Sequence, residues 1–176
     1  MAFEIVNVLK EHFPALRLIG KRYTDADRDA GGGFGEKHRE WHEKACCAGL
    51  AKLGAPGMEN GMFGLMALNS DDHKNFAYWI GYLFPPGTPV PDGFSSLDLP
   101  ESDLGVAWIR GKCPDVFGLD PHNAALAKLR ENGMGNLRGN AGGENTLVFF
   151  ERYNPQRFQP DEQGVFTLDY GFYLAD

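Results

Sequence analysis

One carboxylate, Glu151, interrupts the most apolar stretch near the C-terminal end of the chain, Thr146–Tyr153 (TLVFFERY). The density of Val, Phe and Tyr predicts a strand. Side chains alternate across a strand, so Leu147, Phe149, Glu151 and Tyr153 share one face. If that face is covered, the carboxylate must take up a proton, pair with a cation, or act as an acid or base. The same alternation fits an edge strand with Glu151 in solvent, so the pattern leaves its burial open.

Aromatic side chains are frequent on the predicted strands and supply a second kind of binding group. Most of them belong to the core, but each buried tyrosine hydroxyl or indole N–H needs a partner. Ring faces attract cations, and a carboxylate adds a full countercharge. A pocket of this composition suits flat organic molecules that carry positive charge. The candidate ligand-binding residues are Glu151, Tyr153, Phe149, Trp108, Tyr78 and Tyr170, with Trp41 from a predicted helix.

Three potential metal ligands, His38, His42 and Cys46, follow one another at intervals of four residues. On a helix this spacing places them on one face. Their neighbours at 36–44 are mostly charged, which is typical of a solvated helix face, and paired cysteine spacing is absent. We therefore predict neither a metal site nor a cofactor.

The glycine-rich segment 31–35 (GGGFG) resembles a phosphate-binding loop only superficially. It lacks the Gly-Lys-Ser/Thr ending that holds phosphate and magnesium, and no apolar strand leads directly into it. A flexible lead-in to the following helix is the better interpretation.

Charge and cysteine content narrow the possible partners. The formal net charge is −7, from 17 basic and 24 acidic residues, and no Lys/Arg cluster stands out. Direct nucleic-acid binding is not expected, because phosphate neutralisation needs a basic surface. No segment is long and apolar enough to span a membrane, and no signal peptide is recognisable. The odd number of cysteines (Cys46, Cys47 and Cys113) predicts reduced thiols and a cytoplasmic location.

Hydrophobic periodicity predicts the helices and strands that must position Glu151. One helix is predicted over Glu36–Leu53. A second begins with Asp120 as its N-cap and Pro121 in its first turn, and it stops at Gly133. The predicted strands are Phe3–Val8, Ala15–Tyr23, Gly61–Leu68, Phe76–Phe84, Leu104–Gly111, Leu147–Tyr153 and Val165–Leu174.

The order strand, helix, strand, strand occurs twice. We therefore predict a single domain, 1–176, with a first module at about 1–84, a Pro/Gly-rich linker at 85–103, and a second module at 104–176. Such modules would form an α+β fold with antiparallel sheets and two main helices around a central cleft. The seam between the modules is the expected ligand cleft.

Four short motifs, in this order and at plausible spacings, resemble the GyrI-like small-molecule-binding domain. This domain is also the effector-binding domain of AraC- and MerR-type transcription regulators. The motifs are the F-x-Y-x-x-G pattern of Phe76–Tyr82, the linker residues Val90–Phe94 with Leu97–Pro100, the strand Gly105–Trp108 with Gly111, and the E-x-Y pattern of Glu151–Tyr153.

The resemblance implies that Glu151 is a buried acid that meets cationic aromatic ligands, with Tyr78, Trp108 and Tyr153 as pocket walls. The last strand departs from the family, because Leu168–Leu174 lacks the usual Trp and Pro. With no DNA-binding segment before the domain, we expect a stand-alone member rather than a complete regulator.

Three functions follow, and binding of drug-like or effector molecules around Glu151 ranks first. The alternative is a hydrolase that detoxifies reactive, DNA-alkylating cyclopropane compounds. Some stand-alone members of the GyrI-like family resemble such hydrolases. There Glu151 would be a general base and Tyr153 would donate to the developing oxyanion. The third is interaction with a protein partner through the acidic surface.

Overall fold

The computed structural model describes residues 2–43, 48–53, 61–68, 76–138 and 147–175. Eight strands form one antiparallel sheet in the order β1-β6-β8-β7-β3-β4-β2-β5. This confirms the α+β class and the antiparallel pairing. The strands are β1 (Phe3–Phe13), β2 (Leu16–Tyr23), β3 (Met62–Leu68), β4 (Phe76–Phe84), β5 (Ser95–Leu99), β6 (Ser102–Gly111), β7 (Leu147–Tyr153) and β8 (Phe166–Tyr173).

The centre of the sheet is the pair β3–β7, which joins the strands of the two halves of the chain. β1 pairs with β6 rather than with its sequence neighbour β2. It continues to Phe13, beyond the predicted end at Val8, because its polar residues stay in register with β6 as far as Ser102. Ser95–Leu99, which we expected within the linker, is strand β5, and it pairs with β2.

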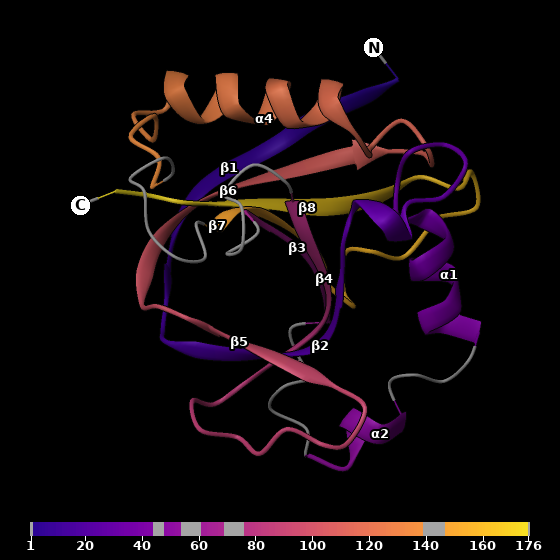
Figure 1. Cartoon of the computed structure of the whole chain (residues 1–176). Coiled ribbons are helices and arrows are strands. Elements are labelled where there is room, and N and C mark those ends of the chain that lie inside the picture. The colour runs from indigo at the N-terminus through magenta and orange to yellow at the C-terminus, as the bar shows by residue number, and fades with distance from the viewer. Residues whose placement is uncertain (1, 44–47, 54–60, 69–75, 139–146, 176) are drawn as a thin grey trace.

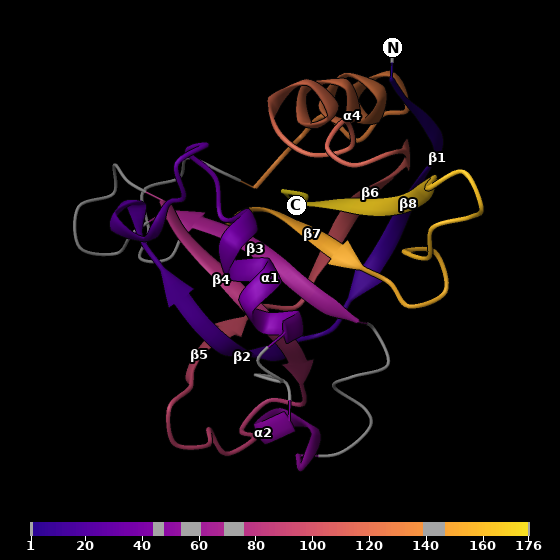
Figure 2. The same cartoon turned by 90° about the vertical axis from the view of Figure 1, so that its right-hand side faces the viewer.

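Two main helices lie on the outer side of the curled sheet, α1 (Gly35–Glu43) and α4 (Leu119–Glu131). Figure 2 shows α1 crossing β3 and β4, α4 near β1 and β6, and β7 between the two helices. A short helix, α2 (Ala48–Ala51), and a 3-10 turn, Asp25–Asp27, complete the described elements. The predicted helix Glu36–Leu53 therefore covers α2 and all of α1 except its first residue, Gly35, and residues 44–47 lie outside the described part.

The predicted start of the second helix was wrong by two residues. Gly118 is the N-cap, and Asp120 lies inside the first turn. Gly118 has φ +93°, which lets the chain turn sharply into the helix, and the N–H that Pro121 lacks would be free in a first turn anyway. The predicted stop is confirmed: Asn132 is the C-cap, and Gly133 has φ +77°.

The sheet has an apolar core on each face, because apolar side chains alternate along the central strands. The concave face gathers Phe13, Leu18, Phe63, Leu65, Trp79, Val106 and Phe150, among others. The convex face packs under the helices and contains Trp41, Tyr78, Ile80, Ala125, Phe149, Tyr153, Tyr170 and Phe172. No helix in the described ranges is long and apolar enough to cross a membrane.

Candidate functional site: a buried carboxylate among three tyrosines

Glu151 lies on the convex face of β7 and is only 7% exposed. β7 is an interior strand, paired with β3 on one side and β8 on the other. No ion pair to Glu151 exists within the described part of the chain. Among the described residues, the site is therefore a carboxylate removed from water without a basic side chain to neutralise it.

Three tyrosine hydroxyls surround this carboxylate. Tyr153, two residues along the same strand, donates to Oε2 at 2.9 Å. Tyr170, directly opposite Glu151 on β8, lies 3.3 Å from Oε1 and donates to the Val116 carbonyl at 3.0 Å. Tyr78 comes from β4, two strands away, and its hydroxyl is 3.4 Å from Oε2. Strands β4, β7 and β8 thus converge on one acid.

Burial and these hydroxyls act on the pKa of Glu151 in opposite directions. Burial raises the pKa above its ordinary value, because the ionised form loses its water, and the three hydroxyls partly oppose this by stabilising the carboxylate. The pKa values of Tyr78 and Tyr153 are raised by burial and then by the Glu151 charge. Both hydroxyls therefore stay protonated and remain donors.

A glycine makes the approach of Tyr78 possible. Gly64 on β3 pairs with Glu151 and separates it from β4. A Cβ at this position would lie 2.3 Å from the Tyr78 hydroxyl oxygen and 3.4 Å from Glu151 Oε2. The tyrosine can cross β3 to reach the carboxylate only because residue 64 has no side chain.

We expect Gly64→Ala to displace the Tyr78 hydroxyl and to lower the free energy of unfolding by about 1–3 kcal/mol through overpacking. Urea unfolding measures this loss. In a Tyr78→Phe background, where the oxygen is gone, the same change should cost at least about 1 kcal/mol less, since contacting residues are not additive. Equal costs in the two backgrounds would contradict the proposed contact.

His38 of α1 completes the group, and sequence reasoning did not connect it with Glu151. Its Nε2 lies 2.5 Å from the Tyr78 hydroxyl oxygen and 3.4 Å from that of Tyr153. Burial, with a smaller contribution from His42, lowers its pKa to about 4, so the ring is neutral at pH 7. Its Nδ1 is buried without a hydrogen-bond partner among the described residues. Only the tertiary structure brings α1, β4 and β7 together.

Cys46, the third residue of the metal arrangement considered with His38 and His42, lies outside the described residues, as does Cys47. Within the described ranges, no group of three His, Cys, Asp or Glu side chains has the geometry to hold a metal ion. His38 instead contacts tyrosine hydroxyls.

An outer layer of aromatic rings covers the tyrosines. Phe34 stacks on Tyr78 with ring centroids 4.5 Å apart and an interplanar angle of 11°. Phe158 contacts Tyr153 edge-on at 4.8 Å, and Phe117 lies nearly parallel to it at 6.5 Å. These three rings come from loops, where no periodic pattern reports the direction of a side chain.

The other candidate residues divide between the two faces of the sheet. Phe149 lies beside the site, 5.5 Å from the Tyr170 ring. Trp41 is the buried residue of α1, and its indole N–H donates to the Tyr23 hydroxyl at 2.9 Å. Trp108 lies on the opposite face from Glu151, with the Arg157 guanidinium 4.3 Å above its ring. The structure therefore groups Phe149, but not Trp108, with the carboxylate.

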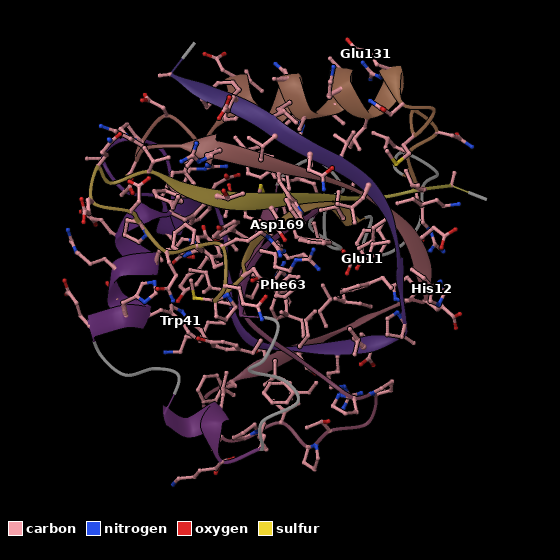
Figure 3. The ribbon with its side chains drawn as sticks, turned by 180° about the vertical axis from the view of Figure 1, so that it is seen from behind. Glu11, His12, Trp41, Phe63, Glu131 and Asp169 are labelled. Atoms are coloured by element: carbon pink, nitrogen blue, oxygen red, sulfur yellow. The ribbon has the colours of Figure 1, made fainter. Side chains whose placement is uncertain are left out.

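Behind Glu151, the concave face holds a buried ion network. Arg152 donates to Asp169 at 2.8 Å and, through both terminal nitrogens, to Glu11 at 2.9 Å each. Arg157 also donates to Asp169, at 2.9 Å from its Nε. Figure 3 labels Asp169 and Glu11, which lie close together within the curl of the sheet. Each carboxylate here has an arginine, in contrast to Glu151.

No protein-family model matches this chain, and no curated protein sequence matches it either. Solved structures do match, at low identity. SAV2435 bound to tetraphenylphosphonium has a TM-score of 0.68 at 14% identity, covering 97% of this chain and 94% of that one. A candidate transcription regulation protein from Staphylococcus aureus MU50 has a TM-score of 0.65 at 13% identity, and the match covers 97% of this chain and 99% of that one. The EcmrR C-terminal domain has a TM-score of 0.51 at 11% identity, and the match covers 100% of this chain and 99% of that one. These matches confirm the fold that the resemblance to GyrI-like domains predicted, and the chain shares it with these bacterial proteins.

Proposed function

We propose that this protein binds amphipathic aromatic cations, with the positive charge of the ligand directed at Glu151. The observation that carries the proposal is a buried carboxylate within hydrogen-bond distance of three tyrosine hydroxyls and without a basic partner in the described ranges. A ligand cation would supply the missing charge. We assign ligand contact to Glu151 together with Tyr78, Tyr153, Tyr170 and Phe149.

The rings around the carboxylate favour the same class of ligand. Aromatic faces attract a cation within about 6 Å of the ring centre. Phe34 and Phe149 extend this aromatic surface beyond Tyr78 and Tyr170. A hydrated inorganic cation would gain little from such walls, whereas a cation that carries aryl groups gains from both charge and apolar burial.

The comparisons add support from shared fold. SAV2435 was solved with tetraphenylphosphonium, a cation with four aryl groups, and the candidate transcription regulation protein from Staphylococcus aureus MU50 has the same fold. We extend to this chain the role of an effector-binding domain in transcription regulation, in which ligand binding is the input signal.

Two probe ions of the same shape and opposite charge test the proposal. Calorimetric titration of the wild-type protein with tetraphenylphosphonium should give saturable binding at one site. Tetraphenylborate, which presents the same four phenyl groups around a negative centre, should bind at least about tenfold more weakly, a difference of about 1.4 kcal/mol. Equal affinities would mean that the apolar groups alone drive binding, and the role of Glu151 would be wrong.

Hydrolysis is the second candidate, and the pairing of Glu151 with Tyr153 favours it. A carboxylate with a raised pKa suits a general base, and a neighbouring hydroxyl suits an oxyanion donor. Incubation of a reactive cyclopropane compound with excess protein, followed by mass spectrometry, separates the two functions. Product formation that is lost in Glu151→Gln supports hydrolysis, and unchanged compound supports binding alone.

A further inference from the structure

A second feature concerns how a ligand reaches a carboxylate that is only 7% exposed. An open hollow of about 760 Å³ lies where α4 begins, between the loop 112–118 and the start of β1. Phe3, Pro114, Phe117 and Leu119 supply apolar surface to it. Leu119 is 71% exposed, so its side chain adds accessible apolar surface to the hollow. The hollow is large enough for a drug-sized group.

One aromatic ring, that of Phe117, lies next to both this hollow and Tyr153. Phe117 lines the hollow, and its ring also lies nearly parallel to Tyr153, with centroids 6.5 Å apart. The preceding residue, Val116, accepts the hydrogen bond of Tyr170, whose hydroxyl is 3.3 Å from Glu151 Oε1. The loop 112–118 therefore contacts the hollow on one side and the carboxylate site on the other.

The charge of the hollow matches the proposed ligand. Asp115 and Asp120 are its charged lining residues, and neither forms an ion pair within the described part of the chain. A second hollow, of about 630 Å³, provides a contrast. There Lys10 pairs with Asp103 at 2.7 Å, and His12 lies 3.2 Å from Glu101. The carboxylates of the first hollow thus have no basic partner within the described part of the chain, whereas those of the second hollow do.

Phe117 is in a suitable position to move. It is half-buried in a loop, and the next residue, Gly118, has φ +93°, a conformation that glycine adopts without strain. We infer that the hollow is the outer chamber of the ligand site and that Phe117 is the partition between it and Glu151. This inference rests on the proposed binding of aromatic cations. An aryl group of the ligand occupies the hollow while the cationic centre is drawn towards Glu151.

The two hollows permit a matched test. Asn123 lines the first and Asn136 the second, and both are exposed. Asn123→Trp fills the outer chamber, so it should lower the affinity for tetraphenylphosphonium about tenfold, a loss comparable with one well-packed aromatic contact. Asn136→Trp introduces the same bulk elsewhere and should leave the affinity unchanged. Calorimetry gives both values, and urea unfolding checks that the two variants are equally folded.

The partition is tested by the rate of association in stopped-flow mixing. Phe117→Ala should accelerate association of tetraphenylphosphonium about tenfold, since no ring must be displaced. Phe34→Ala removes the ring that stacks on Tyr78, so it should weaken binding by accelerating dissociation, but it should leave the association rate unchanged. The reverse result would place access on the α1 side and overturn the inference.

If the wild type fails to bind the cation, the proposed function and the inference both fail. If the wild type binds but Asn123→Trp binds equally well, only the outer chamber is wrong.

Discussion

Glu151→Gln is expected to bind tetraphenylphosphonium about 100-fold more weakly than the wild type at neutral pH, a loss of about 2.7 kcal/mol. The substitution keeps the shape of the side chain and removes its charge. Two opposite charges about 4 Å apart attract by about 4 kcal/mol at an effective dielectric constant near 20, so a loss of this size is reasonable for a poorly hydrated site. Calorimetric titration of both proteins measures it.

The same pair of proteins should differ in pH dependence. A bound cation favours ionised Glu151, and protonation removes the attraction, so the wild-type affinity should fall as the pH drops through the raised pKa of Glu151. The fall is at most about tenfold per pH unit, and it ends when the affinity equals that of Glu151→Gln. The variant should show a flat profile. Titrations are best kept above about pH 5, because His38 has a pKa of about 4 and its protonation would repel the ligand in both proteins.

A matched variant on α1 controls for long-range electrostatics. Glu43 is an exposed carboxylate whose side chain is 64% accessible. Glu43→Gln changes the net charge by the same amount, yet it should alter the affinity by less than about twofold, because solvent and salt screen exposed charges. If both variants lose affinity equally, the ligand responds to overall charge and the proposed site is wrong.

The second large effect is on stability, and it concerns the ion network behind the site. Asp169 is fully buried and accepts hydrogen bonds from Arg152 and Arg157. We expect Asp169→Asn to lower the free energy of unfolding by about 3–5 kcal/mol, because Arg157 loses its carboxylate partner and the buried Arg152 keeps only Glu11. Urea unfolding followed by circular dichroism measures the change.

Asp103→Asn is the matched control for this prediction. Asp103 also pairs with a basic residue, Lys10, at 2.7 Å, but its side chain is 42% exposed. Such a surface pair contributes about 0–1 kcal/mol. Similar losses in the two variants would show that burial does not set the strength of the Asp169 network. Folded Asp169→Asn protein should still bind the cation, since the network lies on the opposite face of β7 from Glu151.

Features that depend on local periodicity could be predicted from the amino-acid sequence. Alternation along Leu147–Tyr153 placed Phe149, Glu151 and Tyr153 on one side of a strand, and the structure has them there. The α+β class followed from the succession of strand and helix patterns, and the helix stop at Gly133 followed from the need for a positive φ. These properties involve neighbours within a few residues, which a linear pattern can report.

The contacts between strands and helices, in contrast, could not be predicted from the sequence pattern and are known from the folded structure. Alternation along β6 could not tell that Trp108 faces away from Glu151, because the facing of one strand relative to another depends on sheet order and register. Nor could it place His38 beside Tyr78, or reveal that Gly64 leaves room for that tyrosine to cross β3. Burial of Glu151 is a property of the same kind, since it requires partners on both sides of β7 and a covering layer that come from distant parts of the chain.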